Sequence, residues 1–332
     1  MANFVLPAGL SITKWTNTFV TEFVRENPYY NYMGNGSKNV IHVNRDLSKG
    51  AGERIRFAYA KKLRGAVITG GAVLRGNEDQ LETGYDEVRV RLQRFGVRFT
   101  EDQTFPTDLP LMNQAKDSLQ EKASDDIAVD VGIELNAVIV AGVAGAADIS
   151  VPLDDATPAQ VTAWETANAD RILTGFTTLS ADAVRAAKSM ALRTALGNSY
   201  AITPLKSDAA KSRDMFVIFA GLDDFEAFAA DPEVKSANEN ARPREVESNP
   251  LFMGGDQYLD GVIVHLDPRI PAGRPVLCGQ NAVLCAWGKP TTMIKDQTDY
   301  GHSIGIGYSE IRGLKKASLE GVQVGIVNII LD

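Results

Sequence analysis

Residues 53–60, ERIRFAYA, and residues 87–99, EVRVRLQRFGVRF, decide the fold that this chain is expected to adopt. In both segments apolar and polar side chains alternate, which is the period of a half-buried β-strand. The side chains expected to face inward are Ile55, Phe57, Tyr59, Val88, Val90 and Leu92. The two segments therefore predict a long two-stranded hairpin.

The apolar set changes parity within the second strand, where it continues as Phe95, Val97 and Phe99. A one-residue slip moves side chains to the other face of a sheet, so we expect a bulge or bend near Gln93–Phe95. The connection between the strands is rich in glycine, which suits a projecting hairpin with a flexible tip. These glycines are Gly65, Gly70, Gly71, Gly76 and Gly84.

The charge of this hairpin differs from that of the rest of the chain. Residues 49–100 contain eleven basic and six acidic residues, a net charge of +5. The whole chain of 332 residues has 34 basic and 42 acidic residues, a net charge of −8, so the remainder carries −13. A basic projection on an acidic body can direct association between copies. The alternative is that arginine and lysine only solvate the exposed strand face.

Residues 108–141 predict one long helix. Thr107 or Asp108 can cap it, and Pro110 falls in the first turn, where proline is tolerated. Its apolar stripe is Met112, Ala115, Leu119, Ala123, Ile127, Val131, Leu135 and Val138. A helix of this length spans about 50 Å. Gly132 is expected to weaken it and to mark a bend.

The first 48 residues are polar and aromatic and are expected to form an arm. Thr13 can open a short helix that carries Trp15, Phe19 and Phe23 at spacings of four. Such aromatic side chains need a surface to bury against. Both an arm crossing another subunit and an arm folded back on its own body satisfy that need.

Beyond the long helix the pattern is mixed. Helices are expected over 157–173, 180–196 and 222–237, with a short buried strand over 215–219. From Asp260 onward the pattern is that of strands, which close with Val322–Leu331. The fold class is therefore α+β.

Composition excludes several classes of protein. Hydrophobic residues at 44% and charged residues at 23% are typical of a globular chain. We find no run of about 18 apolar residues that would cross a membrane and no signal-peptide pattern at the start. Two cysteines, Cys278 and Cys285, form no disulfide scaffold, and a reducing compartment is the simpler expectation. The mildly acidic balance does not indicate a groove-reading DNA-binding domain.

The sequence offers no convincing catalytic, cofactor or metal site. Gly301–Gly305 fits the nucleophile-elbow pattern G-x-S-x-G, which needs a strand before the serine and a helix after it. A polar turn precedes Ser303, a strand-like run follows it, and His42 and His265 come earlier in the chain, against the order of that fold. A serine hydrolase using Ser303 is therefore the weakest alternative. The cysteines, seven residues apart, lack zinc-site spacing, so we expect no enzyme and no cofactor.

Several segments, in the same order, resemble the N4-type family of tailed-phage major capsid proteins. They are Val40–Glu53, Leu74–Leu81, Asn249–Gly254, Asp260–His265, Ala286–Lys289 and Asp299–His302. One departure is Asp79, which stands where that family usually has glutamate. The resemblance extends over about residues 40–320. Residues 143–180 match no segment of the family and are interpreted as an insertion.

The resemblance implies the HK-97-like phage capsid fold. The parts that it implies are an N-terminal arm (1–48), an extended loop hairpin (49–100), a peripheral domain (101–197) with a spine helix (108–141), a mainly axial domain (198–300) and C-terminal strands that return to the peripheral domain (301–332). It also implies a subunit that self-assembles as hexamers and pentamers into an icosahedral virion shell around double-stranded DNA, within the host cytoplasm. An encapsulin-like nanocompartment shares the fold and is the main alternative.

The resemblance further implies particular partners and contacts. The partners are other copies, a portal, and scaffolding and decoration proteins, with DNA enclosed without sequence-specific binding. The residues expected between subunits are Arg54, Arg56, Lys61, Lys62, Arg64, Arg89 and Arg91 on the hairpin, and Trp15, Phe19 and Phe23 on the arm.

Overall fold

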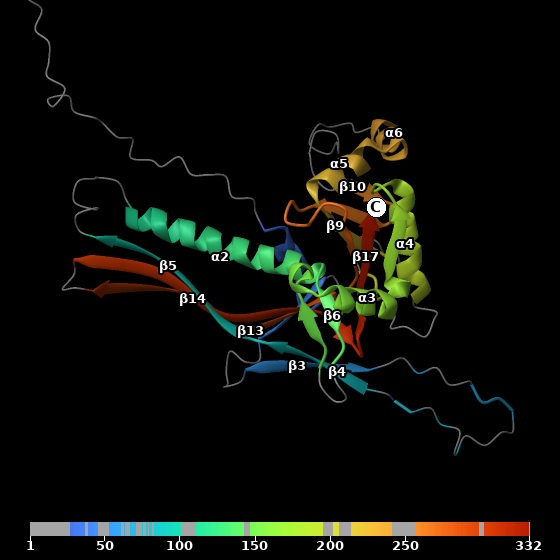
Figure 1. The fold of residues 1–332 in the computed structure, drawn as a ribbon, viewed down its shortest axis with the longest axis horizontal. Helices are drawn as coiled ribbons and strands as arrows, with labels where there is room; N and C mark the ends of the chain where they lie inside the picture. The colour runs from blue at the N-terminus through green and yellow to red at the C-terminus, as the bar shows by residue number, and fades with distance from the viewer. Residues whose placement is uncertain are drawn as a thin grey trace, which may run out of the picture. The chain divides into compact units, whose positions relative to one another are not determined.

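The computed structural model describes most of the chain (Figure 1). The described residues are 27–36, 39–45, 53–60, 63, 67–70, 75, 78, 80–81, 83–100, 111–142, 147–194, 202–205, 214–240, 257–298 and 302–331. Within them the chain forms two compact units. The smaller unit contains Arg94–Asp125 and Thr291–Ser309, and the larger unit contains Asn27–Gln93, Asp126–Pro290 and Glu310–Asp332.

A six-stranded mixed sheet is the centre of the larger unit. Its order is β10 (Gln257–Leu259), β11 (Val262–Leu266), β9 (Phe216–Ala220), β12 (Val276–Cys278), β17 (Ile326–Leu331) and β8 (Ile172–Phe176). Strand β9 is parallel to β11 and antiparallel to β12, and β17 is parallel to β8. A tight turn with positive φ at Asp260 and Gly261 joins β10 to β11.

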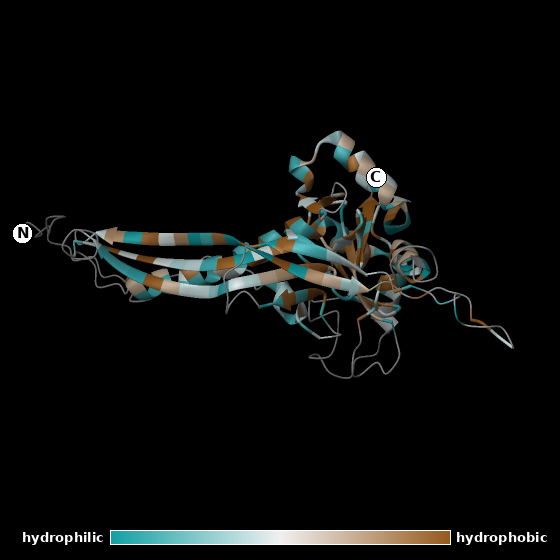
Figure 2. Cartoon of the chain, turned by 90° about the horizontal axis from the view of Figure 1, so that it is seen from below, coloured by the Kyte–Doolittle hydropathy of each residue, from teal (hydrophilic) through white to brown (hydrophobic). Residues whose placement is uncertain are grey.

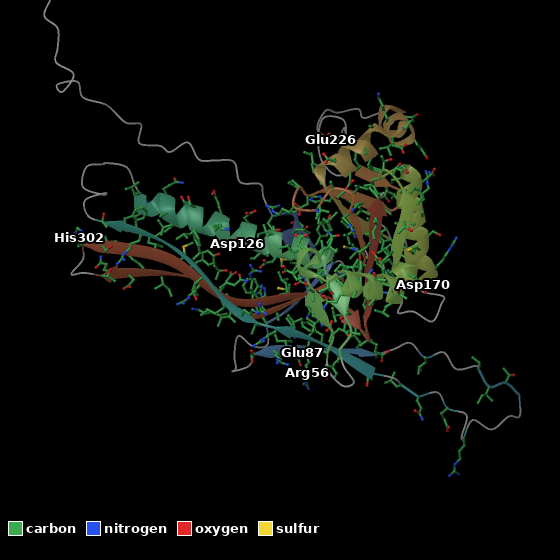
Figure 3. The ribbon with its side chains drawn as sticks, in the orientation of Figure 1. Arg56, Glu87, Asp126, Asp170, Glu226 and His302 are labelled. Carbon is green, nitrogen blue, oxygen red and sulfur yellow. The ribbon has the colours of Figure 1, made fainter. Side chains whose placement is uncertain are left out.

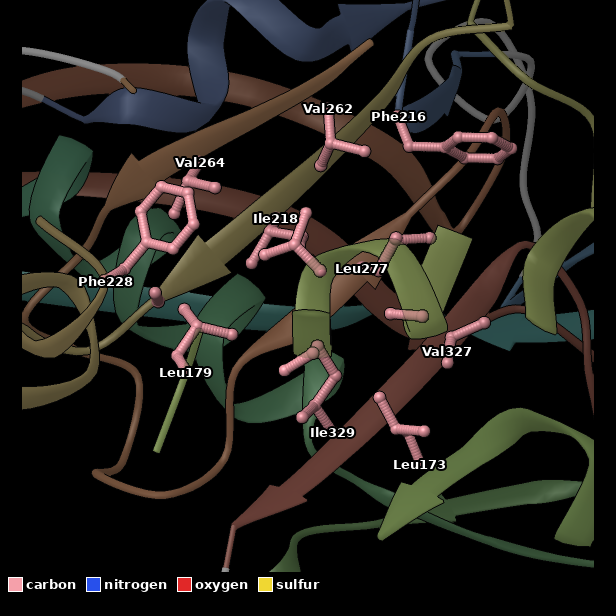
Figure 4. Packing of buried hydrophobic residues seen from close by; sticks show 14 of the residues in the cluster. Leu173, Leu179, Phe216, Ile218, Phe228, Val262, Val264, Leu277, Val327 and Ile329 are labelled. Atoms are coloured by element: carbon pink, nitrogen blue, oxygen red, sulfur yellow. The ribbon is translucent and has the colours of Figure 1, made fainter. Parts of the chain in front are cut away.

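Both faces of this sheet are buried, which is why every residue of β9 is buried. On one face, α4 (Ala181–Thr194), α5 (Leu222–Ala230) and α6 (Pro232–Asn240) supply apolar side chains. Figure 4 shows Phe228 of α5 among Ile218, Val264 and their neighbours. On the other face, Val217 and Phe219 meet the end of the long helix. Pro232 separates α5 from α6, so the single helix expected over 222–237 is wrong.

The long helix α2 runs from Leu111 to Leu135, so the expected end at 141 is wrong. The chain turns at Asn136 and enters the strand β6 (Val138–Val140), which pairs with β7 (Ile149–Val151). The expected apolar stripe is confirmed from Ala115 to Leu135. The helix continues without a break through Gly132, where an added Cβ would make ordinary contacts with Arg269.

Helix α3 (Pro158–Ala167) begins as expected but ends early. The Thr157 hydroxyl accepts from the backbone N–H of Gln160, whose side chain accepts from the Thr157 N–H, so a capping box fixes the start. The structure then forms the 3-10 turn η5 (Ala169–Arg171) and β8, where a helix to Leu173 had been expected. An earlier 3-10 turn, η4 (Leu153–Asp155), precedes α3.

The predicted hairpin is present as β3 (Arg54–Ala60) paired with β4 (Thr83–Arg89). Its alternation is confirmed, with Ile55, Phe57 and Val88 buried against Leu284 and Ala286 of β13. The strand is interrupted at Val90 rather than near Gln93–Phe95, because β5 (Arg91–Thr100) leaves the hairpin for another sheet. Figure 2 shows hydrophobic and hydrophilic residues alternating along the long strands.

That second sheet has the order β1 (Met33–Gly34), β2 (Ile41–Asn44), β13 (Val283–Thr298), β14 (Ser303–Lys316) and β5. In the smaller unit, Leu119 and Ala123 of α2 pack on Ile306 and Tyr308 of β14. Small residues let the strands approach, since a Cβ on Gly96 would lie 3.1 Å from the Ile306 carbonyl oxygen. A two-stranded ladder of β15 (Ser318–Leu319) and β16 (Val322–Gln323) follows β14.

The segment before β1 belongs to the core of the larger unit. Tyr29 lies in the 3-10 helix η2 (Pro28–Tyr32) and is fully buried. The centre of its ring is 4.8 Å from that of the Phe219 ring.

Cys278 and Cys285 are free and buried, and burial raises the pKa of both thiols, that of Cys285 to about 12. Among the described residues, no helix has both the length and the apolar character that crossing a membrane requires.

Candidate assembly interface

The outer face of the β3–β4 hairpin is the most distinctive surface of the larger unit. The register places Arg54 opposite Arg89 and Arg56 opposite Glu87. Ala58 lies opposite Tyr85, which is 40% exposed. We call the face formed by Arg54, Arg56, Tyr85, Glu87 and Arg89 the hairpin face. Figure 3 shows Arg56 and Glu87 together on it.

Acidic partners within the hairpin balance part of its positive charge. Glu87 accepts from Arg54 Nη1 at 2.7 Å and from Arg56 Nε at 3.0 Å, while Arg89 pairs with Glu53. Partial desolvation raises the pKa of Glu87, but the hydrogen bonds from Arg54 and Arg56 outweigh it and hold that pKa below its usual value. The Arg56 guanidinium also lies 4.9 Å from the centre of the Tyr85 ring. The hairpin face therefore presents ordered arginine side chains held in an ion-pair network.

Strand β5 continues the basic character. Arg91, Arg94 and Arg98 are all exposed, and Arg98 donates to the Thr298 hydroxyl. Within the described part of the chain, Arg91 and Arg94 have no ion-pair partner in the structure. Leu92 and Phe95 on the same strand are 55% and 50% exposed, against the expectation that both face inward.

A buried ion pair anchors the hairpin to its own subunit. Asp86 of β4 is 1% exposed, pairs with Lys315 of β14 and accepts from the Ser318 N–H at 2.9 Å. Lys315 also donates to the Asp148 carbonyl oxygen at 2.6 Å. Burial raises the pKa of Asp86, and Lys315 only partly offsets this effect.

The contact between the end of β4 and β14 also depends on one glycine. A Cβ on Gly313 of β14 would lie 2.1 Å from the Arg89 carbonyl oxygen, so only glycine lets the end of β4 cross there. The stem of the hairpin is therefore packed on the body and does not project freely. At its described tip, Leu63, Val67 and Leu81 are exposed.

Next to Lys315, Lys316 is fully buried and joins four elements. Its Nζ donates to Asn328 Oδ1 of β17 at 2.9 Å and to the Ala137 carbonyl oxygen at 3.2 Å, and lies 5.0 Å from the Trp164 ring centre. Its backbone N–H donates to Glu134 of α2 at 3.1 Å. Burial lowers the pKa of the Lys316 ammonium to about 7, although Cys278 and Glu134 act to raise it.

Sequence reasoning found only part of this arrangement. Arg54, Arg56, Arg89 and Arg91 are exposed, as surface residues between subunits must be. Lys61, Lys62, Arg64, Trp15, Phe19 and Phe23 lie outside the described residues. The anchor Asp86 was missed, although the sequence contains a signal for it. Asp86 shares the inward parity of Val88 and Val90, and a carboxylate at such a position needs a buried partner.

The structure does not supply the context of a nucleophile elbow. Ser303 opens β14, a strand of 14 residues, so no helix follows the serine. Among the described residues, no group of three or more histidine, cysteine, aspartate or glutamate side chains could hold a metal ion.

Comparison with known proteins gives this architecture a family. The model of the family described as phage capsid protein matches residues 3–273, more than half of the chain. The chain belongs to the phage capsid protein family. No curated protein sequence matches the chain significantly.

Solved phage capsids share the fold over nearly the whole chain. The capsid of cyanophage Pam1 is 30% identical with a TM-score of 0.87, covering 99% of this chain and 98% of the other. The capsid of Ralstonia phage GP4 is 19% identical with a TM-score of 0.74, covering 99% and 97%. That of Helicobacter pylori bacteriophage KHP30 is 14% identical with a TM-score of 0.72, covering 98% and 96%. The predicted HK-97-like fold and the resemblance to phage major capsid proteins are thus confirmed.

Proposed function

We propose that this phage capsid protein assembles with copies of itself, as hexamers and pentamers, into the icosahedral shell of a tailed phage that encloses double-stranded DNA. Membership of the capsid family supports the structural role, and the proposal includes no enzymatic activity. Assembly would take place in the host cytoplasm, with portal, scaffolding and decoration proteins as further partners. The parts of the subunit would be the arm, extended loop, peripheral domain and axial domain within the boundaries given above.

The hairpin face is the observation that carries the self-assembly proposal. Its inner side is fixed to the body by Asp86 and Lys315, while its outer side holds arginines in a defined geometry. A face that is rigid before binding loses little conformational entropy when a partner docks. Standard interfaces bury about 1,600 Å², and a shell subunit would make several of them.

Charge reversal at Arg89 of the hairpin face and at Arg91, the first residue of β5, tests the proposal. The double variant Arg89→Glu/Arg91→Glu should raise the subunit concentration needed for shell formation at least about tenfold, equivalent to ~1.4 kcal/mol. Thermal unfolding of the subunit should change far less, since both side chains are exposed. Light scattering and electron microscopy would follow assembly.

Arg193→Glu/Lys235→Glu is the matched control. It makes the same change in charge at exposed positions on α4 and α6. Full shells formed by Arg89→Glu/Arg91→Glu at the wild-type concentration would contradict the role of the hairpin. A wild-type protein that forms no closed particles would contradict the proposed function itself.

A further inference from the structure

The turn that follows strand β1 contains the single Asn-Gly step of the chain, Asn35-Gly36. In such a step the backbone nitrogen of the glycine can reach the asparagine side chain, because glycine has no Cβ to obstruct the approach. Both residues are exposed. Within the described part of the chain, the Asn35 side-chain amide has no hydrogen-bond partner. The amide can therefore rotate toward the Gly36 nitrogen.

A neighbouring side chain, that of Asn39, holds this nitrogen. With the Asn39 amide oriented so that its oxygen faces donors, Oδ1 accepts from the Gly36 N–H at 2.7 Å and from the Asn35 N–H at 3.1 Å. The Asn39 backbone is fixed in turn, since its N–H donates to the Gly36 carbonyl oxygen and its carbonyl oxygen accepts from the Asn281 N–H, both at 3.3 Å. The Gly36 nitrogen must therefore break a hydrogen bond before it can reach Asn35.

The Asn-Gly step lies in the connection between two paired strands. Strand β1 runs parallel to β2, with Met33 opposite Ile41. The Gly36 carbonyl oxygen also accepts from Gln280 Nε2 at 3.4 Å, ahead of β13. A change in the backbone at Asn35 is therefore placed to affect the edge of the sheet that contains β1, β2 and β13.

Asn35 also lines a hollow beside β2. The hollow is lined as well by Tyr30, His42, Arg45 and Trp287, and the described residues that line it include no carboxylate. Burial lowers the pKa of His42, which favours its neutral form. A carboxylate formed at position 35 would bring a negative charge into the hollow that contains the Arg45 guanidinium.

We propose that Asn35 is a site of spontaneous deamidation and that Asn39 controls its rate. The Gly36 nitrogen bonds to Cγ of Asn35 and gives up its proton, and the side-chain amino group leaves with a proton as ammonia. The product is a five-membered succinimide ring. One water molecule then opens the ring at either carbonyl carbon, which leaves aspartate or isoaspartate. Water is the only co-reactant, so the step needs no oxidant, metal or second protein.

The two products would alter the subunit in different ways. Aspartate adds only the negative charge in the hollow. Isoaspartate also takes Cβ into the main chain, so the connection between β1 and β2 becomes longer by one carbon atom. Subunits of different age would therefore differ in charge and in backbone at this sheet edge. The inference goes beyond the proposed function and does not depend on shell formation.

Incubation of the full-length wild type at mildly alkaline pH, followed by peptide mass spectrometry, tests the proposal. Digestion in mild acid prevents conversion during preparation, and electron-transfer fragmentation distinguishes isoaspartate from aspartate. Asn35 should convert with isoaspartate among the products. Asn44, which lines the same hollow and is paired with Ala286 in the sheet, is the internal control and should remain an amide. Equal conversion of Asn35 and Asn44, or aspartate as the sole product, would overturn the inference.

Three variants test the role of Asn39 and of the glycine. Asn39→Ala removes the hydrogen bond to the Gly36 nitrogen and should speed conversion about threefold to tenfold, the factor that one ordinary hydrogen bond represents. Asn39→Asp keeps an oxygen acceptor and should convert no faster than the wild type. Gly36→Ala should slow conversion at least about tenfold, because it obstructs the attacking geometry.

The alanine at position 36 fits the fold. The φ angle of Gly36 is not positive, and an added Cβ would lie 3.3 Å from the end of the Asn39 side chain, which can adjust. Thermal unfolding of each variant would confirm that it is folded. Full retention of the Asn35 amide in the wild type after Asn39→Ala has converted completely would overturn the inference, as would equal rates in the two proteins. The wild-type comparison of Asn35 with Asn44 needs no variant and decides the case in which a substitution disturbs folding.

Discussion

Replacement of the buried Lys316 by methionine should change how stability depends on pH. Methionine keeps most of the side-chain volume and removes the ammonium that donates to Asn328 and Ala137. The pKa of Lys316 is about 7 in the folded chain, against 10.5 for an ordinary lysine. Between these values the unfolded chain binds a proton that the folded chain does not, so the stability of the wild type rises with pH.

The expected size of this pH effect follows from the pKa values of Lys316 in the folded and the unfolded chain. Integration of the proton difference from pH 7 to pH 9 gives the wild type a gain of about 2 kcal/mol from this one group, and the variant gains none of it. The lost hydrogen bonds lower the stability of the variant equally at both pH values, so they cancel in the comparison. The difference in unfolding free energy, wild type minus variant, should therefore rise by about 2 kcal/mol.

Urea unfolding followed by tryptophan fluorescence measures this difference, and Trp164 lies beside the substituted side chain. Lys235→Met, which removes an exposed ammonium on α6, is the control and should leave the pH dependence unchanged. Parallel stability profiles for the wild type and Lys316→Met between pH 7 and pH 9 would refute the reasoning.

Three further substitutions test the packing of the subunit. Asp86→Asn breaks a buried ion pair and should cost about 3–5 kcal/mol, with faster amide exchange in β3 and β4; unchanged exchange would mean that the pair does not anchor the hairpin. Gly313→Ala places a Cβ against the Arg89 carbonyl oxygen and should cost about 1–3 kcal/mol in urea unfolding, whereas an unchanged midpoint would show that the crossing can relax. Gly132→Ala meets only ordinary contacts in α2 and should stabilise by about 0.5–1 kcal/mol, read as a higher melting temperature; a lower one would contradict the expected fit.

The sequence predicted the elements in which apolar residues recur at a regular spacing. The alternation of β3 and the stripe of α2 were read correctly, since each needs only one buried face. The end of α2 was missed because Val138 continues the helical spacing, although it is buried equally well in β6. The break between β4 and β5 at Val90 was missed because a change of sheet partner is visible in the sequence only as a change in the parity of the apolar positions. That change in parity appears three residues later in the sequence.

The candidate interface was predicted in part for a similar reason. Arginines that alternate with apolar residues in a strand are expected on its exposed face. Arg54, Arg56 and Arg89 were therefore predicted correctly as surface residues. Their pairing with Glu87 and Glu53 depends on the hairpin register, which the sequence does not specify over so long a connection. Lys316 lies more than 170 positions from its partners Glu134 and Ala137, and no local pattern reveals contacts at that separation.

The two buried cysteines have a practical consequence. Thiols react with maleimides and with disulfides as thiolates, and burial keeps Cys278 and Cys285 in the protonated form at neutral pH. A cysteine introduced on the surface would then be the fast-reacting group among the described residues. Fluorescent dyes or other small molecules could be attached to the solvent-exposed side of α3 without removal of the native cysteines.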